Sequence, residues 1–89
     1  MPTIWIAVLN ISPRVAEKIW NRHELEPNDV RLAVVARTGL PFRWDDHPER
    51  GRRAVVETVI ARKKVACVLY PVEHPLGGVW NLGGVYGGD

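Results

Sequence analysis

The sequence predicts an α+β fold, with two N-terminal helices packed on a curled antiparallel sheet of about four strands and an extra N-terminal strand. Three observations lead to this prediction. Apolar residues recur at helical spacing between residues 12 and 37, strand-like alternation dominates from residue 52 to residue 86, and the first nine residues are apolar on both faces of a strand. With 89 residues, the chain has room for one domain, spanning residues 1–89.

The first strand is predicted from Thr3 to Leu9, and its two apolar faces indicate burial on both sides. A helix is then predicted to begin at Ser12-Pro13, because serine can cap a helix and proline fits its first turn. His23 shares the apolar stripe of this helix, so we expect it to be a half-buried packing residue.

A second helix is predicted to begin at Pro27 and to run to about Arg37, with Gly39 as its natural stop. A short edge strand should follow from Pro41 to Asp45, and a turn-rich loop from Asp46 to Gly51.

The C-terminal half is predicted to be a meander of three further strands. These are Arg52–Arg62, Val65–Tyr70 and Val79–Tyr86, with a hairpin tip at Lys63-Lys64 and a loop from Pro71 to Gly78. Gly83-Gly84 inside the last strand suggests a bulge or a close approach by another backbone.

The composition restricts the class of protein. No apolar run approaches the ~20 residues that a membrane span needs, and the first nine residues lack the features of a signal peptide. The one cysteine, Cys67, lies in an apolar run, so we expect a cytoplasmic protein with an inert buried thiol. Three scattered histidines show no metal-ligand spacing, and no glycine-rich phosphate loop opens a helix, so we expect neither a metal nor a cofactor.

Two segments carry a resemblance to a known family. The join between the helices reads Arg22-His23-Glu24-Leu25-Glu26-Pro27-Asn28-Asp29-Val30, and a charged loop, Asp45 to Arg53, precedes a hairpin of the expected length. This order of elements over residues 12 to 86 resembles the BrnT-like toxins of the RelE/ParE superfamily. The last strand departs from the family, because Val79 to Gly84 stands where those toxins commonly carry an arginine-containing run.

The resemblance implies the toxin of a type II toxin–antitoxin system, an RNA endonuclease that inhibits translation without a metal. Its partners would be RNA, including ribosome-bound mRNA, and a cognate antitoxin, in a homodimer or a toxin–antitoxin complex, with no membrane involved. The departure in the last strand supports an alternative, a degenerate relative that binds nucleic acid or protein without catalysis.

The candidate catalytic residues have the side chains that RNA cleavage by internal attack requires. A base and an acid move protons, and cations hold the phosphate. The candidates are His47, Arg50, Arg53, Glu57 and Tyr86. Alternation places Glu57 and Arg53 on the face of their strand away from the core. Tyr86 is included because related nucleases often place a tyrosine near their C-terminus. A solvated turn, a surface ion pair and ordinary packing are the competing interpretations.

Further basic and polar residues are candidates for binding. Those for RNA are Arg52, Arg62, Lys63, Lys64 and His74. Those for a protein partner recur every four residues on the first helix, at Arg14, Lys18 and Arg22. A solubilising turn and a solvated helix face are the alternatives.

Overall fold

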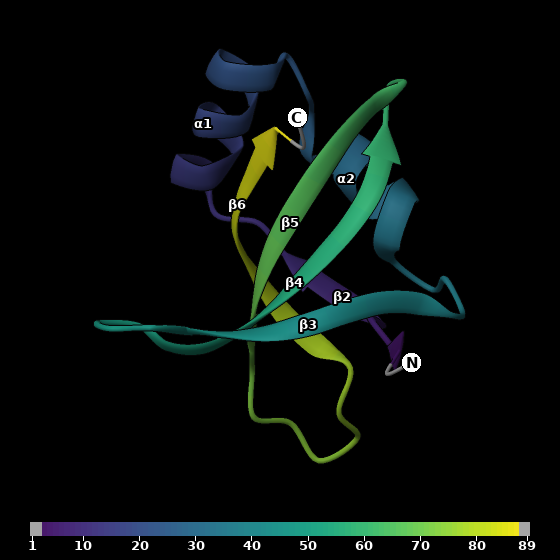
Figure 1. The fold of residues 1–89 in the computed structure, drawn as a ribbon, viewed down its shortest axis with the longest axis vertical. Helices are drawn as coiled ribbons and strands as arrows, with labels where there is room; N and C mark the ends of the chain where they lie inside the picture. Colours follow the sequence, from purple (N-terminus) through teal and green to yellow (C-terminus); the bar gives the residue numbers. More distant parts are fainter. Residues whose placement is uncertain (1–2, 88–89) are drawn as a thin grey trace.

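In the computed structural model, which describes residues 3–87, a curled sheet encloses a core that two helices cover (Figure 1). The elements in chain order are β1 (Thr3–Ile4), β2 (Val8–Asn10), α1 (Pro13–His23), α2 (Pro27–Val34), β3 (Leu40–His47), β4 (Gly51–Ile60), β5 (Lys63–Pro71) and β6 (Val79–Gly87). The predicted α+β class, the two helices and the curled sheet are confirmed.

The sheet is mixed and has six strands in the order β1-β3-β4-β5-β6-β2. Strands β3 to β6 form the predicted antiparallel meander, whereas the N-terminal segment supplies both edges, with β1 antiparallel to β3 and β2 parallel to β6. The prediction of one strand from Thr3 to Leu9 in an antiparallel sheet of about four strands is therefore wrong in detail. The segment is broken because the N–H groups of Ala7 and Val8 turn to the carbonyl of Gly78, at 2.8 and 3.1 Å.

The first helix begins as predicted. Ser12 Oγ accepts a hydrogen bond from the backbone N–H of Val15 at 3.2 Å, and Pro13 occupies the first turn. The second helix ends at Val34, three residues before Arg37, where the sequence placed its end. Ala36 adopts a positive φ of 57° and donates its N–H to the carbonyl of Ile6 at 2.8 Å, so the N-terminal segment ends the helix before Gly39. Among the described residues, no helix is long and apolar enough to cross a membrane.

Two boundaries of the meander also differ from prediction. Strand β3 continues through Asp46 and His47, which the sequence assigned to a loop. The tip of the β4–β5 hairpin is Ala61-Arg62, with φ of 51° and 66°, and Lys63 and Lys64 already belong to β5. Two consecutive positive φ values are typical of the two-residue turns that match the twist of a hairpin.

The core lies between the helices and one face of the sheet. Its members from the central strands include Ala54, Val56, Cys67 and Leu69, all with 0% exposure. The predicted bulge is present, as the β5–β6 register shifts between Val68 and Leu69. The close approach at Gly83 is made by a side chain, because a Cβ there would overlap the ring of Tyr70.

Candidate functional site

The polar side chains gather on the face of the meander that points away from the core, which we call the open face. It is formed by Arg43, Asp45 and His47 of β3, Arg53, Val55 and Glu57 of β4, Ala66, Val68 and Tyr70 of β5, and Gly84 and Tyr86 of β6. Alternation along β4 sends Ala54 and Val56 to the core and their neighbours to this face.

A cavity of about 510 Å³ lies on the open face. It brings together three of the predicted catalytic residues, His47, Arg53 and Tyr86, and adds Arg43, which the sequence did not single out. The polar lining is therefore two guanidinium groups, an imidazole, a phenol and the Asp45 carboxylate, and the two permanent cations suit an anionic ligand.

Arg53 is held in place from two sides. Its Nε donates to Asp45 Oδ2 at 2.8 Å, and its Nη1 donates to the Tyr70 hydroxyl at 3.5 Å. The hydrogen bond with Tyr70 and then that with Asp45 raise the pKa of Arg53, so the guanidinium stays protonated. Period-two alternation over Arg43, Asp45 and His47 would have revealed this face of β3, had the strand been extended to His47.

The His47 ring accepts hydrogen bonds from the backbone of the turn that follows it. Its Nδ1 lies 3.1 Å from the backbone nitrogens of both Glu49 and Arg50, and both N–H groups donate to it. A neutral ring that accepts at Nδ1 carries its proton on Nε2. In this geometry His47 can donate a hydrogen bond into the cavity, but it has no free lone pair with which to take a proton.

Glu57 lies one step further along the open face. It pairs with Ala66 in the β4–β5 ladder, and Ala66 pairs with Tyr86 in the β5–β6 ladder. The small Ala66 side chain thus separates a carboxylate from a phenol on one rung of the sheet. Glu57 and Lys64 line a neighbouring hollow of about 290 Å³, and Tyr86 is 49% exposed.

Three predicted residues lie elsewhere. Arg50 lines a different hollow of about 430 Å³, together with Val15 and Tyr70. The guanidinium of Arg52 stacks over Trp44, away from the open face. His74 lies in the loop between β5 and β6, at the far end of the sheet from the β4–β5 tip (Figure 1), and its Nδ1 accepts the N–H of Leu76 at 3.2 Å.

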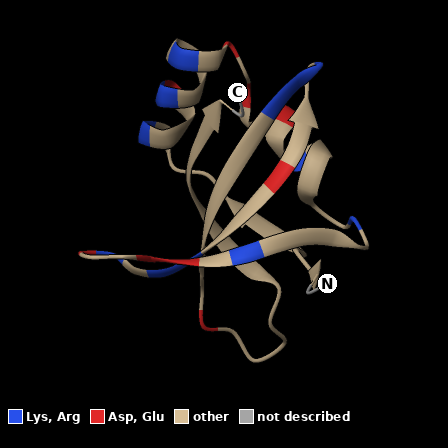
Figure 2. Ribbon diagram, viewed as in Figure 1, with Lys and Arg blue, Asp and Glu red and all other residues tan. Residues whose placement is uncertain are grey.

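The remaining basic residues form two exposed groups. Figure 2 shows the basic bands of α1, which correspond to Arg14, Lys18 and Arg22, and a basic tip on the β4–β5 hairpin, which contains Arg62, Lys63 and Lys64. The two groups meet where Lys63 Nζ donates to the carbonyl of His23 at the end of α1, at 3.3 Å. His23 is half-buried, as predicted, and its Nε2 donates to the carbonyl of Val85 at 2.8 Å.

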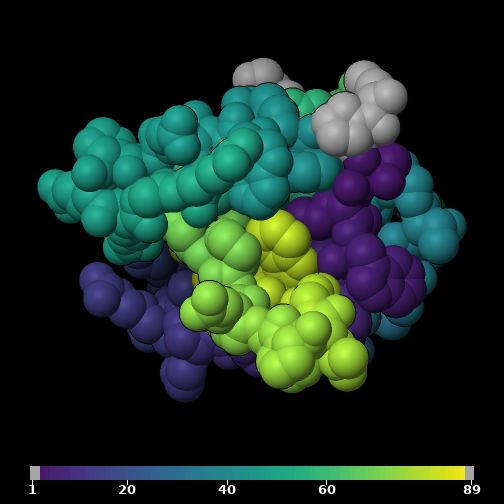
Figure 3. Space-filling view, turned by 90° about the horizontal axis from the view of Figure 1, so that it is seen from below, coloured from purple at the N-terminus to yellow at the C-terminus, as the bar shows by residue number. Residues whose placement is uncertain are grey.

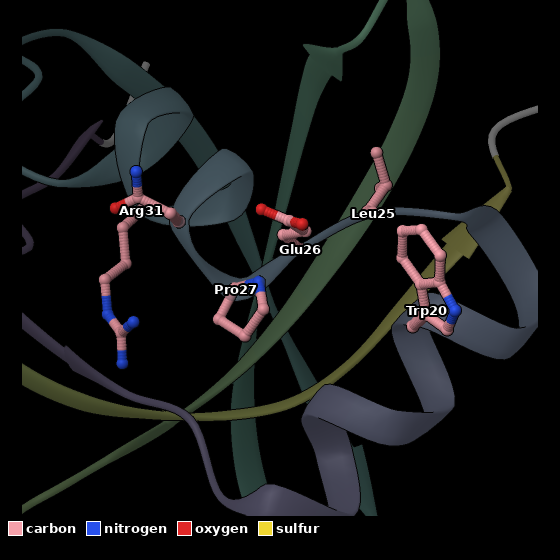
Figure 4. A pocket seen from close by; sticks show the side chains of 6 residues that line it. Trp20, Leu25, Glu26, Pro27 and Arg31 are labelled. Carbon is pink, nitrogen blue, oxygen red and sulfur yellow. The ribbon is translucent and has the colours of Figure 1, made fainter.

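A separate pocket of about 460 Å³ lies between α1 and α2, on the helix side of the sheet (Figure 4). Trp20 and Arg31 lie on opposite sides of it, with Pro27 and Glu26 between them. This pocket was not predicted from the sequence, and it contains none of the predicted site residues.

Within residues 3–87, no three His, Cys, Asp or Glu side chains cluster in a way that could hold a metal ion. The polar side chains of the open face are those of two arginines, one aspartate, one glutamate, one histidine and two tyrosines. Comparisons of this chain with known protein families, with curated proteins and with solved structures found no match.

Proposed function

We propose that this protein is the toxin of a type II toxin–antitoxin system and that it cleaves RNA bound across the open face. The observation that carries the proposal is the cavity in which Arg43 and Arg53 lie beside the Glu57–Ala66–Tyr86 rung. Two permanent cations can hold a phosphate, while the Glu57 carboxylate, the half-buried His47 ring and the exposed Tyr86 hydroxyl lie around it.

The roles follow from the hydrogen bonds. In cleavage by internal attack, the 2′-hydroxyl loses its proton and attacks the adjacent phosphorus. The bond to the 5′-oxygen then breaks, and that oxygen takes up a proton from water. Glu57 is the base in this proposal, because His47 Nδ1 is occupied by two backbone N–H groups. Arg43 and Arg53 stabilise the charge on the phosphate, and Tyr86 positions the substrate.

The experiment is a cleavage assay with end-labelled RNA, both free and in a translating extract, read on a denaturing gel. Glu57→Gln should lower the cleavage rate by about 10²–10⁴-fold and change RNA affinity little, because the amide keeps its size but cannot take the proton. Glu73→Gln, an exposed acid in the β5–β6 loop, is the matched control and should cleave like the parent. Equal rates for all three proteins would reject Glu57 as the base.

A second candidate function is RNA binding without cleavage. It is favoured by one observation: the three histidines, His23, His47 and His74, each use a ring nitrogen in a hydrogen bond to the backbone. Salt-sensitive RNA binding by a parent protein that leaves RNA intact, both free and on ribosomes, would support this candidate over the first.

The proposed partner is an antitoxin that meets the exposed row of Arg14, Lys18 and Arg22 on α1. The three side chains carry the same charge, and the first turn of α1 contains no acidic residue. This row therefore suits an acidic segment of a partner protein. Growth arrest on expression, relieved by co-expression of the neighbouring gene, tests the toxin proposal. Replacing the three basic residues with glutamine should then abolish the relief but not the arrest.

A further inference from the structure

Two consecutive arginines of β4 behave differently although each faces an aspartate of β3. Arg53 is opposite Asp45 and forms an ion pair with it at 2.8 Å. Arg52 is opposite Asp46, yet it forms no ion pair among residues 3–87, and its guanidinium lies 4.3 Å from the centre of the Trp44 ring. The Arg52 guanidinium thus lies over the Trp44 ring without an ion pair to a carboxylate among residues 3–87.

Trp44 is itself supported by aromatic neighbours. The Phe42 ring packs edge-on against it, with centroids 5.2 Å apart and an interplanar angle of 83°, and the ring of Trp80 lies 6.1 Å away. Trp80 is anchored by its indole N–H, which donates to the carbonyl of Trp5 at 3.1 Å. Trp44 nevertheless stays 42% exposed, and Arg52 is exposed as well. The Trp44 ring, with Arg52 over it, is therefore accessible to solvent.

The Trp44–Arg52 surface is next to the open face in sequence, but it lies on the other side of β3. Arg43 and Trp44 are consecutive, so they point to opposite faces of the strand. Among residues 3–87, β3 pairs with β1 only at Leu40 and Pro41, and from Phe42 to His47 its pairing partner is β4. Figure 3 shows this end of the molecule, where β3 (teal) lies beside the N-terminal segment (purple) and the start of β6 (yellow). An extended ligand on the open face can cross the edge of β3.

We propose that the stacked Trp44–Arg52 pair is a binding site for an unpaired nucleotide of RNA. The inference rests on the proposed function, because it extends the RNA path from Arg43 over the edge of β3. Unpaired bases stack on aromatic rings and on the guanidinium plane of arginine, and the in-plane N–H groups of Arg52 remain able to contact a phosphate. Asp46, which is opposite Arg52 in the β3–β4 ladder, would repel a phosphate placed beside its own side chain.

The test is fluorescence anisotropy with a labelled single-stranded 12-nucleotide RNA and a matched RNA in which the central nucleotides lack bases. Trp44→Leu and Arg52→Gln should each weaken binding of the intact RNA by about 5- to 100-fold, the range expected for a lost stacking contact. Trp44→Phe, which keeps an aromatic face, should stay within about threefold of the parent. The abasic RNA should bind equally to the parent and to Trp44→Leu.

Trp20→Leu is the control, since Trp20 is also exposed, at 54%, but lies on α1 and should not affect RNA binding. Arg52→Gln keeps the proposal testable if Trp44→Leu fails to fold. If Arg43→Gln weakens binding while Trp44→Leu and Arg52→Gln do not, the nucleotide site is rejected and the proposed RNA function stands. If the parent binds no RNA, both are rejected.

Discussion

Arg53 and Asp45 join β4 to β3 on the open face, with Nε donating to Oδ2 at 2.8 Å. The two side chains are 22% and 37% exposed, so water and salt screen the pair, and its contribution to stability is small. Its main consequence is positional. Together with the Tyr70 hydroxyl, Asp45 fixes the guanidinium at the wall of the cavity.

Replacing Asp45 with asparagine should separate these two roles. The amide keeps an acceptor for Arg53 and removes the Asp45 carboxylate from the lining of the cavity. We expect the free energy of unfolding to fall by less than about 1 kcal/mol in urea titrations. RNA should bind more tightly, with a steeper dependence on salt. Glu49→Gln, an exposed acid in the β3–β4 turn, should change neither quantity. Weaker RNA binding by the asparagine variant would contradict an anion-binding cavity.

Gly83 should not tolerate a side chain. A Cβ would overlap the Tyr70 ring and lie 3.4 Å from the carbonyl oxygen of Val68. Gly83→Ala must displace the ring from its place beside Arg53, and we expect it to lower the free energy of unfolding by about 1–3 kcal/mol in urea titrations. Gly87→Ala, in the same strand with open space around its Cα, is the matched control and should be nearly neutral. A neutral Gly83→Ala would mean that Tyr70 moves away at little cost.

His23 should contribute to stability by holding α1 against the last strand. Its Nε2 donates to the carbonyl of Val85 at 2.8 Å in a half-buried position. His23→Phe keeps the apolar contact but leaves this carbonyl without its donor, and we expect a loss of about 1–3 kcal/mol in thermal or urea unfolding. His23→Gln restores a donor and should recover part of the loss. Equal stabilities for the two variants would show that the hydrogen bond contributes nothing.

The sequence could predict the elements whose signals are local. The cap at Ser12, the proline at the start of each helix and the alternation along β4 all act within one turn or one strand, and each prediction is confirmed. The broken N-terminal strand could not be predicted in this way. Its form depends on Gly78 and Ala36, which are distant in the sequence and bond to the Ile6–Val8 segment.

The candidate site was predicted only in part for the same reason. Asp46-His47-Pro48 was interpreted as part of a turn-rich loop, which ended β3 too early and removed His47 from the strand. Arg43 lay inside the predicted strand, but its place beside Arg53 depends on the register between β3 and β4. The position of Tyr70 depends on the register between β4 and β5, which no local signal gives. The hairpin tip was misplaced because Ala61 and Arg62 lack the glycine or asparagine that usually marks positive φ.

Cys67 should be inert in the folded protein and should make stability fall at alkaline pH. Its side chain is fully buried in the core, and desolvation raises the pKa of the thiol from 9.0 to about 12. The folded state therefore favours the protonated thiol, whereas the unfolded chain ionises above pH 9. The stabilisation is complete below pH 9 and is lost as the pH rises towards 12, at about 1.4 kcal/mol per pH unit.

Other groups also titrate in this range, so the measurement is a comparison. Urea unfolding of the parent and of Cys67→Ala at pH 8 and pH 10 should show a larger decrease for the parent, by about 1 kcal/mol, because alanine has no thiol to ionise. Alkylation at pH 8 should be slow in buffer and fast in urea, since the thiolate is the reactive form and only unfolding exposes it. Rapid alkylation of the native protein, or identical pH dependence in the two proteins, would contradict the burial of this thiol between the sheet and the helices.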